Sequence, residues 1–156
     1  MSYGTLKIPS LLISVPLYEV TSNLSAQDIV DAFNSAVFMK YGNQYLIADH
    51  VSQGKFWNLI KCKSGKTKAK IISQDGTVKN YICVVNQQGF LIVKKESNRL
   101  YDWKWESVID KNPNGLVIYT CQGLKKDNIQ NVTLTYWKEI SEYENEIKTM
   151  QEKYAK

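Results

Sequence analysis

Two residues that could perform chemistry stand at the ends of apolar runs. Cys121 closes the run "GLVIYTC", and His50, the only histidine, closes the run "YLIADH". A thiol inside a strand is usually a small buried hydrophobe, whereas a thiol at a strand end can keep one side open to solvent. A thiol nucleophile also needs a base that manages its proton, and imidazole suits that task. The pair therefore indicates acyl transfer, provided that the fold unites the two residues.

Each of these residues alone also has an ordinary structural explanation. His50 alone could be a hydrogen-bonded structural histidine, and Cys121 alone could be a packed thiol. The two are 71 residues apart in the sequence, so only tertiary structure can bring them together. Two strand ends at the same rim of a barrel would do so.

The body of the chain is predicted to consist of short strands. Residues 5–20 are cut twice by proline and indicate two strands near a sheet edge, because proline cannot donate to a ladder. From Gln44 onward the apolar period drops to two, and turn signals that contain glycine separate most of the runs. The expected strands are "YLIADHV", "FWNLIKC", "AKIIS", "VKNYICVV", "GFLIVKK", "GLVIYTC" and "VTLTYWK". This pattern predicts a closed antiparallel barrel or a sandwich.

Two helices are predicted beside these strands. The segment 25–39 opens on a capping-box spacing, and its apolar residues Ile29, Phe33 and Val37 recur at intervals of four. The C-terminal segment 139–156 carries a narrow apolar stripe on a charged helix, formed by Ile140, Tyr143, Ile147, Met150 and Tyr154. Such a helix either lies on the barrel surface or contacts a second copy or another partner.

Composition narrows the class of protein. The 156 residues suit one core, and no stretch approaches the roughly 20 apolar residues that span a bilayer. The net charge is +5, but 19 of the 20 basic residues are lysines, whereas nucleic-acid readers favour arginine. We therefore expect no nucleic-acid partner. Three cysteines without a CxxC pair predict neither a disulfide scaffold nor a metal site, and we expect no cofactor.

Three motifs in chain order resemble the sortase family, the cysteine transpeptidases that attach surface proteins to Gram-positive cell walls or link pilins. "IPSLLISVPLYE" resembles the first strands of that family. "LIADH" resembles the strand end that carries the family's histidine, often written with Ala-Gly-His, so that Asp49 departs from it. "VIYTC" resembles the family's Thr-Leu-x-Thr-Cys, with Thr120 and Cys121 in place. The resemblance covers residues 7–138.

The family's arginine has no counterpart in the expected place. Sortases carry it at the start of the strand after the cysteine, where this chain has none, since Arg99 precedes Cys121. The position most like it is Asn131, or Gln130 if the register shifts by one. Three possibilities stay open: a slow enzyme, a different use of Asn131 or of Lys125 and Lys126, or a loss of transpeptidation.

The resemblance implies a fold and an activity. The fold would be a closed eight-stranded sortase-type β-barrel with one or two short helices and an added C-terminal helix, with residues 1–138 as the catalytic domain and 139–156 as the helix. The activity would be a cysteine transpeptidase, or a peptidase when water is the acceptor. Cys121, His50 and Asn131 would be catalytic, and Thr120 and Gln130 would bind substrate.

The same resemblance implies partners and a location. The partners would be the sorting signal of a surface protein or pilin and an amine acceptor, with self-association possible through the C-terminal helix. The location would be the outer face of the cell membrane or the cell wall, or the cytoplasm if the chain is full length. The rival hypotheses are a non-catalytic or weakly active sortase-fold module that holds a peptide or protein, and a small basic barrel that binds single-stranded nucleic acid.

Overall fold

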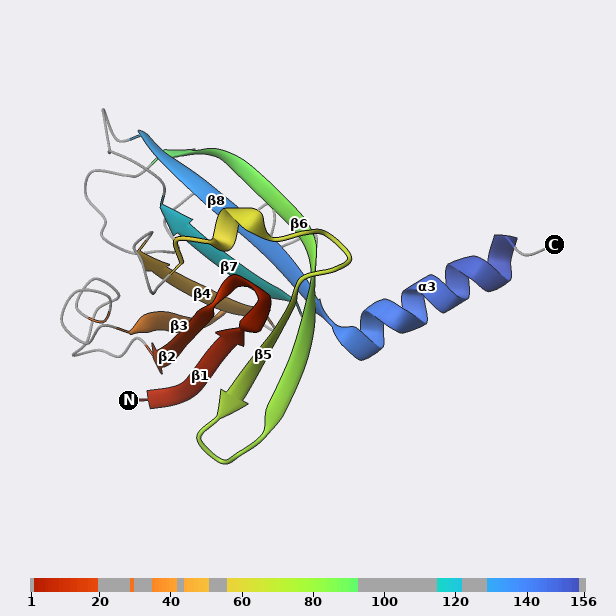
Figure 1. The fold of residues 1–156 in the computed structure, drawn as a ribbon, viewed down its shortest axis with the longest axis horizontal. Helices are drawn as coiled ribbons and strands as arrows, with labels where there is room; N and C mark the ends of the chain where they lie inside the picture. Colours follow the sequence, from red (N-terminus) through yellow and green to blue (C-terminus); the bar gives the residue numbers. More distant parts are fainter. Residues whose placement is uncertain are drawn as a thin grey trace.

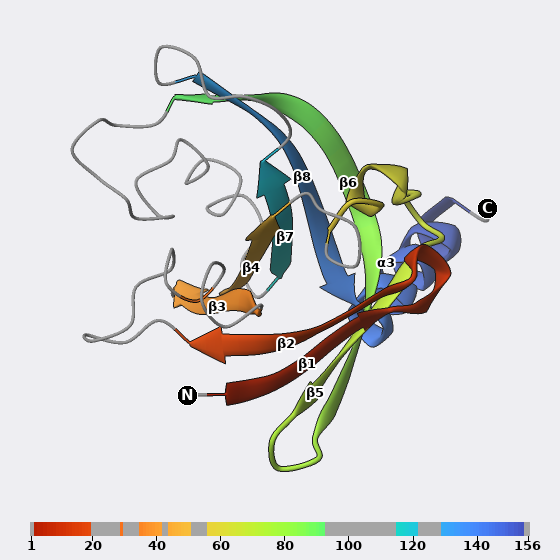
Figure 2. The same ribbon diagram turned by 60° about the vertical axis from the view of Figure 1, so that its left-hand side comes forward.

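The described residues form a closed eight-stranded barrel. The computed structural model describes residues 2–19, 29, 35–41, 44–50, 56–92, 115–121 and 129–154. The strands follow one another around the barrel in the order β1-β2-β3-β4-β7-β8-β6-β5, and a helix extends from one end (Figure 1). Figure 2 shows the long strands β6 and β8 curving together along one side. The predicted barrel with an added C-terminal helix is confirmed.

The two strands predicted over residues 5–20 form, but their predicted place near a sheet edge is wrong, because each has a partner on both sides in the closed barrel. β1 (Ser2–Ile8) and β2 (Ile13–Glu19) run antiparallel and are joined by the 3₁₀ turn η1 (Pro9–Leu11). On its other side β2 pairs in parallel with β3 only from Leu17 onward, so Pro16 lies one residue before that ladder. A proline is tolerated there because the ladder with β3, which begins at Leu17, does not require the N–H that proline lacks.

The helix predicted over 25–39 is wrong from Ala36 onward. β3 (Ala36–Tyr41) begins there and pairs antiparallel with β4 (Gln44–His50), so that Val37 is a strand residue opposite Ala48. The sequence "AVFMKY" is rich in β-branched and aromatic residues, which favour a pleated surface. Of residues 25–34, only Ile29 is described; it is helical and buried.

The strand predicted for "FWNLIKC" is also wrong. This segment forms a turn followed by the 3₁₀ helix η2 (Leu59–Lys61), which precedes β5 (Lys68–Ser73). Phe56 and Leu59 stand three residues apart and are both fully buried in the core. The Asn58 side chain donates a buried hydrogen bond of 2.9 Å to the Leu11 carbonyl. Tertiary contacts therefore decide the local conformation of this short apolar run.

The turn predicted at "NQQG" does not occur. The two expected strands around it are a single strand, β6 (Val78–Ile92), which pairs with β5 along its first part and with β8 (Ile129–Glu139) along most of its length. A bulge between Cys83 and Val85 shifts the register. Residues 86–89 pair with β8, which provides hydrogen-bond partners for their backbone groups. These polar residues can therefore continue the strand instead of forming a loop.

Apolar side chains fill the barrel and also cover part of its outside. The inner core includes Leu6, Phe38, Ile47, Ile118 and Trp137, all fully buried. A second cluster lies on the other face of β4, β7 (Leu116–Cys121) and β8, and consists of Leu46, Ala48, Val117, Tyr119, Leu134 and Tyr136. β4 and β7 are parallel and are buried on both faces, which explains why "LIA" and "LVIY" are continuously apolar.

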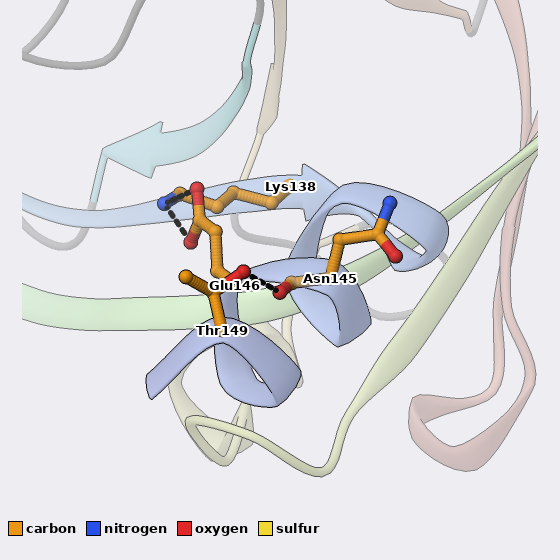
Figure 3. A network of polar contacts seen from close by, with 4 residues as sticks. All are labelled: Lys138, Asn145, Glu146 and Thr149. Atoms are coloured by element: carbon orange, nitrogen blue, oxygen red, sulfur yellow. Dashed lines mark hydrogen bonds and ion pairs between the residues drawn. The ribbon is translucent and has the colours of Figure 1, made fainter. Parts of the chain in front are cut away.

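The terminal helix α3 (Ile140–Tyr154) follows β8 directly and projects away from the barrel (Figure 1). The ammonium group of Lys138 at the end of β8 binds both carboxylate oxygens of Glu146, at 2.7 and 2.9 Å (Figure 3). Of the apolar stripe, Met150 and Tyr154 are 59% and 72% exposed. The predicted helix is confirmed, but the alternative in which it lies along the barrel surface is wrong. No helix in the described part of the chain is long and apolar enough to span a membrane.

Candidate functional site

His50 and Cys121 end two neighbouring strands at the same rim of the barrel. β4 and β7 pair in parallel over six residues, from Tyr45 opposite Leu116 to His50 opposite Cys121. The Cα atoms of these last two residues are therefore direct partners across the ladder, at the usual strand spacing of about 4.8 Å. The parallel register brings together two residues that are 71 positions apart in the sequence.

A buried hydrogen bond ties the two strands together one residue before their ends. The Thr120 hydroxyl donates to the Asp49 backbone carbonyl at 2.7 Å. Thr120 is fully buried and Asp49 is 6% exposed. A bond that is shielded from water in this way is costly to break, so it holds the adjacent positions 50 and 121 in register. In the sequence, Asp49 is recognisable only as a departure from the family motif. Its role as an acceptor could not be predicted, because any residue type supplies a backbone carbonyl.

The third strand of the site is β8. It pairs antiparallel with β7, and Val132 is the partner of Cys121. Asn131 and Gln130 follow toward the start of β8, where they pair with Phe90 and Leu91 of β6. Both residues proposed for the family's arginine position therefore lie on the strand beside Cys121, within two positions of its partner.

Other parts of the predicted site have different outcomes. The sortase resemblance also implies a substrate groove next to Cys121, floored by the strands "YICVV" and "VTLTYW" and walled by the loop 95–114. The second of these belongs to β8 and adjoins β7, but Tyr81 and Cys83 of β6 pair with Glu139 and Trp137, near the opposite end of β8 from Asn131. The expected wall 95–114, with Arg99, and the two lysines Lys125 and Lys126 lie outside the described residues.

A second polar cluster lies at the opposite end of β4 from His50. Lys79 donates a hydrogen bond of 3.1 Å to the Tyr45 hydroxyl, which lowers the pKa of Tyr45 and raises that of Lys79. Tyr3 stacks on Phe38 beside it, with ring centroids 3.9 Å apart. Tyr45 is the second residue of β4, five residues from His50, so this cluster is not part of the rim site. No group of His, Cys, Asp and Glu that could hold a metal is found among the described residues.

Comparison with solved structures identifies the fold. Sortase C from Streptococcus pneumoniae matches with a TM-score of 0.62 and 19% identity, over 89% of this chain and 68% of that one. Sortase C1 from Streptococcus suis matches with a TM-score of 0.59 and 14% identity, over 89% of this chain and 73% of that one. Sortase C-1 from Actinomyces oris matches with a TM-score of 0.56 and 16% identity, over 88% of this chain and 74% of that one. No protein-family model matches the chain, and no curated protein matches it either.

The barrel is therefore the sortase fold. The resemblance that the three sequence motifs indicated is confirmed at this level. The identities of 14–19% lie far below the range in which catalytic residues can be transferred by similarity alone. The function has to be argued from the rim site itself.

Proposed function

We propose that this chain is a sortase-like cysteine transpeptidase that uses Cys121 as its nucleophile and His50 as its acid and base. One observation carries the proposal: the parallel register of β4 and β7 makes the two positions direct partners at a strand end. The sortase fold around them supports the same reading. Thr120 is proposed to position the rim rather than to contact substrate, because its hydroxyl is buried and donates to Asp49.

The proposed reaction is acyl transfer in two steps. The Cys121 thiolate attacks the carbonyl carbon of a peptide bond in a sorting-type motif, and a thioester forms as the C–N bond breaks. His50 gives its proton to the departing amine. An incoming amine, or water, then attacks the thioester and passes a proton back to His50, and Cys121 is released. The similar Streptococcus pneumoniae enzyme is described as acting on pilin substrates, so we propose a pilin or surface-protein sorting signal as the peptide class.

The oxyanion that forms in each step needs a hydrogen-bond donor, and the strand period favours Gln130 for this role over Asn131. Residues two apart on a strand share a face. Position 130 is four residues from Leu134 and so belongs to the same face of β8. Leu134 belongs to the outer cluster with Ala48 and Tyr119, which stand two residues before His50 and Cys121 on their strands. Position 131 belongs to the opposite face, together with Thr133. A carboxamide donates without charge, and charge-assisted bonds are about twice as strong, so we expect a slow enzyme.

Restoring a guanidinium group tests this assignment. We expect Gln130→Arg to raise the rate of peptide cleavage by about 10- to 100-fold, because it strengthens one oxyanion donor with a charge, and a whole donor is worth on the order of 100- to 1000-fold in rate. Asn131→Arg is the matched control, with the same substitution one position along, and should give no comparable gain. A larger gain from Asn131→Arg would show that Asn131, not Gln130, occupies the family's arginine position. No gain from either variant would contradict a role for either residue in stabilising the oxyanion.

The main rival is a barrel that holds a sorting-type peptide without cleaving it. A pool of such peptides mixed with the purified protein separates the two functions, with intact-mass spectrometry as the readout. The transpeptidase forms a covalent adduct that contains the N-terminal part of the peptide and loses the C-terminal part. Binding with no adduct and no cleaved peptide would contradict catalysis and establish the binding module. The proposed location is the outer face of the cell membrane or the cell wall, where such peptides are presented.

A further inference from the structure

Two cysteine thiols lie together inside the barrel, away from the proposed reaction site. Cys62 caps the end of η2 and Cys83 lies in β6, and both belong to the inner core at 6% and 0% exposure. The two thiols are close enough to perturb each other's ionisation, which raises the pKa of Cys62 and lowers that of Cys83, and the Cys83 thiol donates to the Val85 carbonyl at 3.5 Å. The runs "FWNLIKC" and "VKNYICVV" predict a strand position for each of these cysteines. That prediction is wrong for Cys62, which caps η2 beside β6.

Backbone contacts hold the two positions together independently of the thiols. The Asn86 side chain donates to the Cys62 carbonyl at 2.9 Å and to the Ile60 carbonyl at 2.8 Å. The Gly65 N–H donates to the Cys83 carbonyl at 2.7 Å, and the Cys83 N–H donates to the Thr67 carbonyl at 2.8 Å. Residues on both sides of Cys62 are thus fixed to β6, at Cys83 itself and at Asn86. Two thiols that lie side by side on a backbone fixed in this way can be joined with little rearrangement.

We propose that Cys62 and Cys83 form an intramolecular disulfide when the chain folds under oxidising conditions. The inference does not depend on the proposed transpeptidase activity. The oxidant is a small-molecule disulfide such as oxidised glutathione, which takes up the two electrons. One protein thiolate attacks it and releases one glutathione thiol, and the second protein thiolate then attacks the mixed disulfide and releases another. The bond forms before the η2 segment closes over β6, because the folded core shields both sulfur atoms.

The bond would leave one thiol in the chain. The protein has three cysteines, so a Cys62–Cys83 disulfide makes Cys121 the sole free thiol. Cys83 is the register partner of Trp137, which is also the partner of Leu116 at the opposite end of β7 from Cys121. The bond therefore forms at a distance from the rim and also prevents the two core thiols from pairing with Cys121.

Refolding in a glutathione buffer tests the inference. The full chain is unfolded with a reductant, refolded with reduced and oxidised glutathione, denatured, alkylated and digested with trypsin. The sequence places Cys62, Cys83 and Cys121 in three different tryptic peptides, so each thiol is scored separately. We expect one alkylated thiol, on Cys121, and a crosslinked peptide pair that contains Cys62 and Cys83. The oxidised protein should melt about 5–10 °C above the reduced one, because the bond restricts the unfolded chain.

Variants of the core thiols provide the controls. Cys121→Ala should form the same crosslink, and Cys62→Ala should leave Cys83 alkylated after denaturation rather than joined to Cys121. Three alkylated thiols in refolded wild-type protein would overturn the inference, as would glutathione retained on Cys83 or a crosslink that includes Cys121. These readouts require no substrate, so they can fail while the peptide experiment succeeds.

Discussion

Replacement of Cys121 by alanine abolishes formation of the covalent peptide adduct and lowers cleavage of a sorting-type peptide by at least about 1000-fold. The Cys121 sulfur is the proposed attacking atom of the first step and the leaving group of the second, and removal of a nucleophile leaves only binding and oxyanion stabilisation. The fold should be retained, since the residue is the last of β7 and alanine keeps its Cβ. The measurements are adduct mass, initial cleavage rate and the melting temperature of the variant.

Cys62→Ala is the matched control for this loss. It is the same substitution at a thiol in the barrel core, and it should leave the cleavage rate within about threefold of wild type while lowering stability through the lost packing. An adduct that persists in the Cys121 variant, or that forms on another residue, would discard the nucleophile assignment.

The largest expected effect on stability is that of Trp137→Ala. Trp137 is fully buried, and its indole N–H donates at 2.7 Å to the Thr135 hydroxyl, which in turn donates at 2.6 Å to the Ile118 carbonyl. The residue pairs with both Cys83 and Leu116, so it packs where β6, β8 and β7 meet. Loss of such an aromatic side chain costs about 3–5 kcal/mol in the free energy of unfolding. Urea denaturation of the purified variant measures this change.

Trp57→Ala provides the comparison. Trp57 is 38% exposed, and the Lys61 ammonium lies 5.7 Å from the centroid of its ring. An exposed cation–π contact is worth about 0.5–1 kcal/mol, so this variant should lose about 1 kcal/mol or less. Equal losses for the two variants would contradict the placement of Trp137 at the centre of the barrel core.

The sequence predicted elements that have a strong local signal. β7 and β8 were expected because their runs are rich in β-branched and aromatic residues, and α3 because its stripe keeps a helical period over 15 residues. The segment "FWNLIKC" has the composition of a strand, but the core takes up Phe56 and Leu59 from a 3₁₀ turn. The residues "NQQG" have the composition of a turn, but β8 pairs with them as a continuous strand. In both segments tertiary pairing overrides local preference.

The candidate site was predictable in part. The two residue types and their positions at strand ends were visible in the sequence, but their partnership was not, because a local pattern does not specify which strands become neighbours or in which register. Strand order places β7 beside β4, and the ladder then pairs His50 with Cys121. The bond from Thr120 to Asp49 was equally hidden, since it ends on a backbone carbonyl.

The partnership of His50 and Cys121 can be measured without a substrate. In a His50→Cys variant, mild oxidation should crosslink position 50 to Cys121, because the Cα atoms of ladder partners lie within the range of about 4.4–6.8 Å that a disulfide spans. Tyr45→Cys, at the other end of β4, is the control and should give no bond to Cys121. We predict the crosslink by peptide mapping in the His50 variant alone. Its absence in a folded, oxidised variant would contradict the shared rim on which the proposed function rests.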